Sequence, residues 1–312
     1  MKRSEAGFDV VVIGGGINGV GVVQAVAAAG YSVALIEKRS LAAGTSSRSS
    51  KLVHGGLRYL ENFDFKLVRE SLKERELLLR IAPTLVKRIP FHIPLYRESS
   101  RSALKVGTGL LLYQLLASCH EKTGFRLLNQ SQWRNLDGLK LEGLTRVFQY
   151  WDAQTDDAAL TRAVMRSAQQ LGAKLFAPAE FLTAESLDHG YRVSYHQDGM
   201  TGQLQARIVI NAAGPWVHEV AQRFKPPLPV AATDNVQGTH IEVDAPLSKG
   251  AYYLEAPSDK RAVFVLPWRD RTLIGTTETY YDGSPDEVQP LESEISYLRS
   301  VYGHYFCTGD VD

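Results

Sequence analysis

Three glycines stand close together near the start of the chain, at Gly14, Gly16 and Gly19, between two apolar stretches. In a G-x-G-x-x-G turn the first glycine permits a tight bend and the second lets a pyrophosphate approach the main chain. The third lets the following helix pack closely on the strand. Free N–H groups and the positive end of the helix then face the phosphates. The spacing predicts binding of a dinucleotide, and a tight turn without a ligand is the alternative.

An acidic residue supports the dinucleotide interpretation, because Glu37 ends the next apolar stretch, 18 residues after Gly19. A carboxylate at this place can accept hydrogen bonds from the ribose hydroxyls of adenosine and disfavours a 2′-phosphate. NAD and FAD share this half, so the loop alone does not distinguish them. We assign the following residues to it: Gly14, Gly16, Asn18, Gly19, Glu37 and Lys38.

A second group of candidate residues lies in the stretch GTSSRSSKLVHGGLRYL, residues 44–60. Its short hydroxyl side chains can hydrogen-bond a ligand. Two adjacent glycines, Gly55 and Gly56, let the main chain lie against a flat ring. A serine-rich loop without a ligand is the alternative interpretation.

These residues must be positioned by a βαβ unit. Residues 9–13 and 32–37 are apolar and rich in β-branched side chains, which indicates buried strands, and residues 18–29 between them are typical of a helix. Parallel strands joined by a helix place the first turn at the carboxyl edge of their sheet. Residues 64–81 and 156–171 also have helical patterns.

The second half of the chain has a different texture. Beyond Lys174 it consists of short alternating runs separated by Gly, Pro, Asp and Ser, which is typical of a largely antiparallel sheet. One run differs, since ARIVINAAG at residues 206–214 has a continuous apolar core. It predicts a buried strand that returns to the first sheet.

Composition excludes several classes of protein. The 35 Lys and Arg nearly balance the 34 Asp and Glu, so nucleic acid is not an expected partner. The two cysteines, Cys119 and Cys307, form neither a disulfide framework nor a metal-ligand spacing, and no metal is expected. The apolar run at residues 107–117 is about half of the roughly 20 residues that a membrane-spanning helix needs. With no signal-peptide pattern at the N-terminus, we expect a cytoplasmic protein.

The stretch SSKLVHGGLRYL, together with the glycine loop, resembles the FAD-dependent glycerol-3-phosphate dehydrogenases within the glycine oxidase and D-amino acid oxidase group of flavoproteins. The resemblance continues through NAAGPWV, GTHIEV, VFVLPWRDRTLIGTTE and SEISYLRSVY, and covers nearly the whole chain. It implies FAD as a permanently bound redox group. The implied fold is α/β, with a Rossmann-like FAD-binding domain and an inserted, largely antiparallel α+β substrate-binding domain. We expect the FAD-binding domain in residues 1–85 and 150–225 and the substrate-binding region in residues 86–149 and 226–312.

The resemblance also implies roles for individual residues. The flavin cradle it implies consists of Thr45, Ser46, Ser47, Ser50, Lys51, Leu52, His54, Gly55 and Gly56, and the adenosine-side contacts are Ala213, Gly214 and Trp216. Arg58 and Tyr59 are placed on the substrate side of the flavin. His240 matches the family's active-site histidine and is the candidate base, because an imidazole titrates near neutral pH. Thr276 is a further substrate-side candidate, or equally a hydroxyl that caps its own turn.

The implied reaction is oxidation of sn-glycerol 3-phosphate to dihydroxyacetone phosphate, with electrons passed to membrane quinone. Between residues 66 and 105, ten Lys and Arg stand against four Glu, beside the apolar run at 107–117. We therefore expect peripheral association with the anionic surface of the inner membrane. A solvated basic helix beside an ordinary core helix is the alternative. A homodimer is compatible with this interpretation.

Three other functions are left open: a glycerol-3-phosphate oxidase that uses oxygen, an amine or amino acid oxidase of the same fold, and a truncated, non-catalytic flavin-binding protein or partner subunit. Two positions depart from the family pattern, because Gln237 stands where the family often has lysine and Glu278 where it often has aspartate. Family members also continue beyond residue 312, with a flavin-contacting strand and phosphate-holding Arg and Lys. The chain is therefore expected to lack part of the site.

Overall fold

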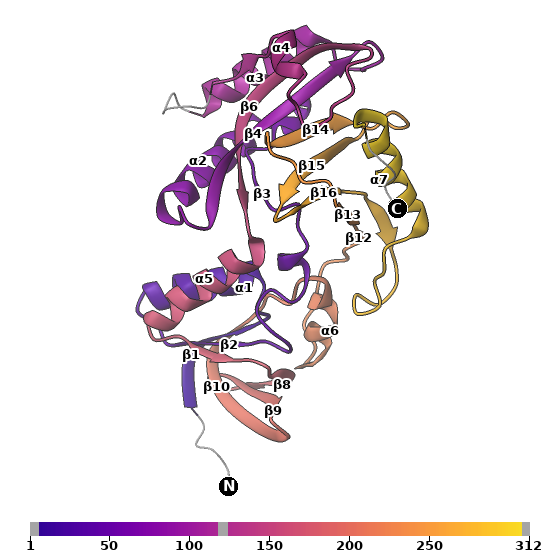
Figure 1. Cartoon of the computed structure of the whole chain (residues 1–312). Coiled ribbons are helices and arrows are strands. Elements are labelled where there is room, and N and C mark those ends of the chain that lie inside the picture. Colours follow the sequence, from indigo (N-terminus) through magenta and orange to yellow (C-terminus); the bar gives the residue numbers. More distant parts are fainter. Residues whose placement is uncertain (1–5, 118–123, 308–312) are drawn as a thin grey trace. The chain divides into compact units, whose positions relative to one another are not determined.

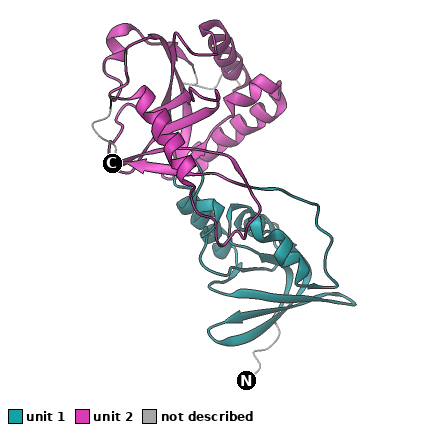
Figure 2. Ribbon diagram, turned by 90° about the vertical axis from the view of Figure 1, so that its right-hand side faces the viewer, with its two compact units in different colours: residues 1–49, 156–235 teal, residues 50–155, 236–312 magenta. Residues whose placement is uncertain are grey.

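The computed structural model describes residues 6–117 and 124–307, so Cys119 lies outside the described residues. The chain divides into two compact units, coloured separately in Figure 2. Unit 1 comprises residues 1–49 and 156–235, and unit 2 comprises residues 50–155 and 236–312. Residues 50–85, which the sequence grouping placed with the FAD-binding domain, are thus part of unit 2.

Packing explains where residues 50–85 belong. Strand β3 (Leu52–Val53) pairs with β6 (Leu144–Thr155), and helix α2 (Phe65–Ile81) packs beside α3 (Ala103–Leu116). These partners share one apolar core of unit 2. A segment that buries its apolar side chains there folds with that unit.

Unit 1 contains a seven-stranded sheet in the order β11-β8-β9-β10-β1-β2-β7. Its strands are β1 (Ala6–Ile13), β2 (Val33–Ile36), β7 (Lys174–Phe176), β8 (Glu180–Leu187), β9 (Gly190–Gln197), β10 (Met200–Asn211) and β11 (Phe224–Lys225). Strand β1 runs parallel to both β2 and β10, with Asn211 opposite Ile13. The prediction that residues 206–214 return to the first sheet is therefore confirmed, but the predicted burial of this run is wrong, since Ile208 is 55% exposed and Val209 and Ile210 are only partly buried.

Side chains of β1 alternate between two cores, as the pleat of a strand requires. Val10 and Val12 pack against α1 (Ile17–Ala28) and α5 (Asp157–Gln170), which lie side by side on one face (Figure 1). Val11 and Ile13 face the other core, which includes side chains of β8, β9 and α6 (Val217–Gln222). Among the described residues, the short 3-10 turns are η1 (Thr45–Ser47), η2 (Leu57–Asn62) and η3 (Gly214–Trp216).

Unit 2 is built on an eight-stranded sheet, which follows the order β13-β16-β15-β14-β4-β6-β3 with β5 paired to β6. Besides β3 and β6 its strands are β4 (Val86–Tyr96), β5 (Arg126–Leu127), β13 (His240–Val243), β14 (Ala251–Glu255), β15 (Ala262–Trp268) and β16 (Arg271–Gly275). Strands β4 and β14 are parallel, and the neighbouring pairs are antiparallel. The predicted antiparallel character of this region is confirmed.

Helices cover both faces of the unit 2 sheet. Helices α2 and α3 pack on one face, and α7 (Glu292–Tyr305) packs on the other, where Leu298 and Val301 are fully buried. A short helix α4 (Gln130–Trp133) lies near the edge formed by β5, and a separate ribbon pairs β12 (Asn235–Gln237) with β17 (Thr279–Tyr281). No helix among the described residues is long and apolar enough to cross a bilayer.

Candidate functional site

The glycine turn between β1 and α1 is shaped by close main-chain contacts. Gly14 has a φ of +109°, which residues with a side chain rarely adopt. A Cβ on Gly19 would lie 1.9 Å from the carbonyl oxygen of Gly14. Gly16 is the N-cap residue of α1. Because the helix begins directly against the strand end, its first N–H groups are presented at the edge where a pyrophosphate binds in this type of turn.

The carboxylate of Glu37 lies beside this turn, at the end of β2. Its Oε2 accepts a hydrogen bond from the N–H of Gly15 at 2.7 Å, and its Oε1 accepts one from the N–H of Arg39 at 2.8 Å. Each carboxylate oxygen keeps a further lone pair for a ribose hydroxyl. Asn18 and Lys38, the other two residues assigned to this half, are exposed.

The segment that follows β10 meets the same turn. A Cβ on Gly14 would lie 2.5 Å from the carbonyl oxygen of Ala212, directly before Ala213 and Gly214. The ring of Trp216 lies against Gly44 and 5.4 Å below the guanidinium carbon of Arg39. The structure therefore brings the predicted adenosine-side residues and the glycine turn together within unit 1.

The predicted flavin cradle is divided between the two units. Unit 1 contains Thr45, Ser46 and Ser47, whereas unit 2 contains Ser50, Lys51, Leu52, His54, Gly55 and Gly56, and also Arg58, Tyr59, His240 and Thr276. Ser46 Oγ accepts a hydrogen bond from the N–H of Ile17 at 2.9 Å, so this hydroxyl lies at the N-terminus of α1. Lys51 is buried, with its ammonium 5.2 Å from the ring centre of Trp268, and Leu52 is in β3.

His240 begins β13 and contacts the serine-rich segment directly. Its Nε2 lies 2.9 Å from Ser50 Oγ. Gly275 is its partner on β16, and a Cβ at that position would lie 2.2 Å from His240 Cδ2. Only a residue without a side chain leaves room for the ring here. The neighbouring Thr276 hydroxyl donates to the carbonyl oxygen of Thr277 at 3.0 Å, which matches the alternative that it caps its own turn.

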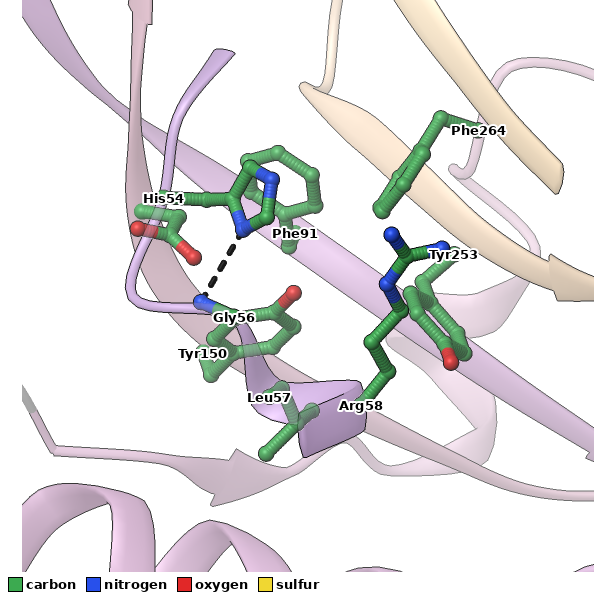
Figure 3. A pocket seen from close by; sticks show the side chains of 9 residues that line it. His54, Gly56, Leu57, Arg58, Phe91, Tyr150, Tyr253 and Phe264 are labelled. Carbon is green, nitrogen blue, oxygen red and sulfur yellow. Dashed lines mark hydrogen bonds between the residues drawn. The ribbon is translucent and has the colours of Figure 1, made fainter. Parts of the chain in front are cut away.

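Part of the segment 54–58 lines a small pocket (Figure 3), whose lining residues are His54, Gly56, Leu57, Arg58, Phe91, Tyr150, Asp152, Tyr253 and Phe264. His54 Nδ1 accepts a hydrogen bond from the N–H of Gly56 at 2.9 Å, so the neutral ring carries its proton on Nε2. Burial lowers the pKa of His54, against the opposing charge of Asp152. The neutral imidazole is thus the form present near pH 7.

Arg58 supplies positive charge at the edge of this pocket. Its guanidinium lies 5.1 Å from the ring centre of Tyr59 and donates to the Tyr59 hydroxyl at 3.3 Å. This hydrogen bond raises the pKa of Arg58, and the side chain is exposed. The cation is therefore available to an anionic ligand.

A buried polar network of Tyr113, Asp152 and Arg75 supports the main chain at Gly55, and none of these three side chains was singled out from the sequence. Tyr113 accepts a hydrogen bond from the N–H of Gly55 and donates one to Asp152 Oδ2, both at 2.8 Å. Arg75, 1% exposed, donates to Asp152 Oδ1 at 2.8 Å. Burial works to lower the pKa of Arg75, but the Asp152 carboxylate outweighs it and the pKa is raised. This network holds the main chain between His54 and Arg58.

Tyr113→Phe should lower the free energy of unfolding by about 1–3 kcal/mol, because it leaves the buried Gly55 N–H and Asp152 Oδ2 each without one partner. Urea denaturation followed by circular dichroism measures this change. Tyr280→Phe is the matched control, since Tyr280 is 66% exposed and its loss should change stability by less than about 0.5 kcal/mol. Equal stability of the two variants would contradict the role assigned to the network.

The unit 1 residues fit FAD by their local chemistry. The positive φ of Gly14, the contact that excludes a side chain at Gly19, and the Glu37 carboxylate together form the site that an adenosine diphosphate group requires. FAD, when bound, supplies the two-electron redox chemistry that no protein side chain here provides.

Comparison with known proteins agrees with this fit. The family model described as "FAD dependent oxidoreductase" matches residues 9–312. A glycerol-3-phosphate dehydrogenase of Synechocystis sp. is 42% identical over 93% of this chain, and a D-erythritol 1-phosphate dehydrogenase of Brucella abortus is 39% identical over 96% of it. The crystal structure of the glycerol-3-phosphate dehydrogenase from Bacillus halodurans complexed with FAD is 26% identical, with a TM-score of 0.75 over 98% of this chain.

The chain spans little more than half the length of these relatives: 56% of the Synechocystis protein, 60% of the Brucella protein and 54% of the Bacillus chain. The family match nevertheless extends over nearly all of the present sequence, and the fold is that of the FAD-bound structure. FAD is the cofactor of this fold. The chain therefore belongs to the FAD-dependent oxidoreductase family.

Proposed function

We propose that this protein oxidises the secondary hydroxyl of sn-glycerol 3-phosphate, giving dihydroxyacetone phosphate. The observation that carries the proposal is the contact between His240 and Ser50, because it joins the candidate base to the serine-rich motif of residues 44–60. The 42% identity to a glycerol-3-phosphate dehydrogenase supports the choice of substrate.

The reaction removes a proton from the hydroxyl oxygen and a hydride, which is a hydrogen with its electron pair, from the carbon. FAD, when bound, accepts that hydrogen and the electron pair. The imidazole of His240 takes the hydroxyl proton, and its side chain is half-buried rather than fully solvated. Ser50, bonded to Nε2, and Gly275, beneath the ring, keep the imidazole in one orientation. The carbonyl of the product forms as the oxygen loses its proton.

Arg58 is proposed to bind the phosphate of the substrate. A guanidinium matches phosphate oxygens in geometry and stays charged near neutral pH. Two of the relatives named above are dehydrogenases of phosphorylated polyols, which supports an anionic group in the substrate. The loop that carries Arg58 is fixed through Gly55 by the Tyr113 and Asp152 network.

Anaerobic titration of the FAD-loaded chain tests the proposed function. Addition of sn-glycerol 3-phosphate should bleach the flavin absorbance near 450 nm, while glycerol at the same concentration should leave it almost unchanged, because glycerol lacks the phosphate. D-Erythritol 1-phosphate, tested in parallel, separates a selective site from one that accepts any polyol phosphate. An unchanged spectrum with each of these compounds would show that this chain binds flavin without catalysing the reaction.

Membrane quinone is the proposed electron acceptor, with oxygen as the alternative. Helix α3 supports a membrane contact, since Leu104, Leu111 and Leu115 share one face and are 79%, 51% and 61% exposed. The basic stretch supports it less than expected. Arg75 and Arg88 are paired with buried or half-buried carboxylates, and Arg101 and Lys105 are paired with Glu61.

The acceptor is decided by reoxidation of the substrate-reduced protein. Ubiquinone in vesicles that contain anionic lipid should restore the oxidised spectrum faster than dissolved oxygen does. Hydrogen peroxide formed in proportion to substrate, with no acceleration by the vesicles, would assign the protein to the oxidases instead.

A further inference from the structure

The buried carboxylate of Glu294 on α7 accepts hydrogen bonds from the two segments that contain His240 and Thr276. Glu294, 4% exposed, accepts on Oε2 from Gln237 Nε2 and Thr239 Oγ1, each at 2.7 Å. Its Oε1 accepts from Thr277 Oγ1 at 2.7 Å and from Thr279 Oγ1 at 2.9 Å. Oε2 also accepts the N–H of Leu291, at the start of the same helix, at 3.0 Å.

The location of these donors in the sequence is what links Glu294 to the site. Thr239 immediately precedes His240, and Thr277 immediately follows Thr276. The two threonines also bond each other, because the N–H of Thr239 donates to Thr277 Oγ1 at 2.8 Å and the N–H of Thr277 donates to the Thr239 carbonyl oxygen at 3.3 Å. Glu294 therefore bonds two separate chain segments, through Thr239 next to His240 and through Thr277 next to Thr276.

Neighbouring residues of an extended chain point to opposite sides. Thr239 bonds Glu294, on the side of α7, while His240 bonds Ser50. The carboxylate thus lies behind the strand end that presents the imidazole. Its hydrogen bonds go to Thr239 and Thr277, which are the chain neighbours of His240 and Thr276, so we expect its effect on the reaction to be transmitted through the main chain.

The site of Glu294 is built for a charged carboxylate and not for its amide. Burial alone would raise the pKa of Glu294, but the bonds from Leu291, Thr239, Thr277 and Gln237 lower it to about 2. All of its partners donate. A glutamine at this position would direct its NH2 group at hydroxyls that donate to the carboxylate, so donors would face donors. Thr277 Oγ1 also already accepts a hydrogen bond from the N–H of Thr239.

We propose that Glu294 is a positioning residue for the reaction, which fixes the strand ends bearing His240 and Thr276 in their working register. The inference rests on the proposed function for its kinetic consequence, but its structural consequence is separate. Loss of the carboxylate should release both segments from α7 and displace the imidazole. A misplacement of about 1 Å at a reacting group lowers a rate by up to about 100-fold.

The test compares Glu294→Gln with Glu292→Gln, an exposed glutamate two residues earlier in the same helix. The limiting rate of flavin bleaching by glycerol 3-phosphate is measured per bound flavin. It should fall by about 10- to 100-fold in Glu294→Gln, with a smaller change in the half-saturating substrate concentration, and stay unchanged in Glu292→Gln. A role in stability alone would lower the melting temperature and leave the rate per bound flavin intact, and that result would overturn the proposal.

Two further measurements separate the possible failures. In a His240→Ala background, Glu294→Gln should lower the bleaching rate by a much smaller factor than in the wild type, because the effect that passes through His240 is already lost. The imidazole NMR signals of His240, assigned by their absence in His240→Ala, should shift in Glu294→Gln but not in Glu292→Gln, and unshifted signals would refute the positioning role. This readout does not depend on turnover, so it decides the inference even if glycerol 3-phosphate fails to reduce the wild-type flavin.

A milder variant covers the case in which Glu294→Gln does not fold. Thr279→Val removes one of the two hydrogen bonds to Oε1 and preserves the shape of the side chain. It should shift the His240 signals in the same direction by a smaller amount. Signals identical to those of the wild type would count against the proposal.

Discussion

Gly19→Ala should weaken FAD binding by about 10- to 100-fold. The new Cβ would lie 1.9 Å from the Gly14 carbonyl oxygen, so α1 must move away from β1. Overpacking of this kind costs about 1–3 kcal/mol, and the movement also displaces the N–H groups that face the pyrophosphate. Fluorescence titration of the flavin-free protein with FAD measures the dissociation constant.

Gly21→Ala is the control for this variant. Gly21 belongs to the same helix two residues later, and a Cβ there would meet no atom within 4 Å. Alanine also favours helix by about 1 kcal/mol relative to glycine, so this variant should bind FAD normally and unfold at a slightly higher temperature. Normal affinity in Gly19→Ala would show that the turn does not hold the cofactor.

His240→Ala should slow flavin bleaching by sn-glycerol 3-phosphate about 100- to 10,000-fold, the range that a general base contributes. The bound FAD should be unaffected. The variant removes the imidazole that lies against Gly275 and contacts Ser50, and it leaves the glycine turn of unit 1 intact. Stopped-flow absorbance under anaerobic conditions gives the rate, and the absorbance spectrum before mixing gives the flavin content.

His196→Ala serves as the comparison, because His196 is an exposed histidine of β9 in unit 1. It should bleach at the wild-type rate. If His240→Ala does the same, another group removes the hydroxyl proton, and the assignment of His240 as the base is wrong.

Local patterns were sufficient for the dinucleotide half of the protein. The predicted strand, turn, helix and second strand correspond to β1, the glycine turn, α1 and β2, because each signal lies within a few residues of the structure it specifies. The return of β10 to the first sheet was also predictable, since its continuous apolar core has the composition of a strand buried on both faces.

The long strands of unit 2 were not predicted. Strand β4 lies between β14 and β6, yet it contains Pro90 and Pro94 and has Lys87 and Arg88 near its start, all of which argue against a central strand. Tertiary pairing with β6 overrides this local preference. The partners of residues 50–85 are likewise distant in sequence, so the packing of this segment in unit 2 was not evident from local patterns.

The supporting residues of the site could not be found from one sequence. Tyr113 is 39 residues from Asp152 and Arg75 is 77 residues from it, and no local motif marks such pairs. Glu294 stands in a helix whose pattern indicates an ordinary capped N-terminus. Its role becomes visible only when the fold brings four polar side chains from two separate segments around it.

Because Gly275 has no side chain, the proposed base is held in a well-defined position. The imidazole of His240 rests on main-chain atoms of the adjacent strand, and main chain within a ladder has no rotamers to exchange. Because the sheet is stiff, the lone pair of the His240 ring keeps a fixed direction. Under the proposed function, we therefore expect the fixed base, the flavin and Arg58 together to discriminate between the enantiomers of glycerol 3-phosphate, because three fixed points of contact allow the O–H and the C–H of a chiral alcohol to align in only one hand.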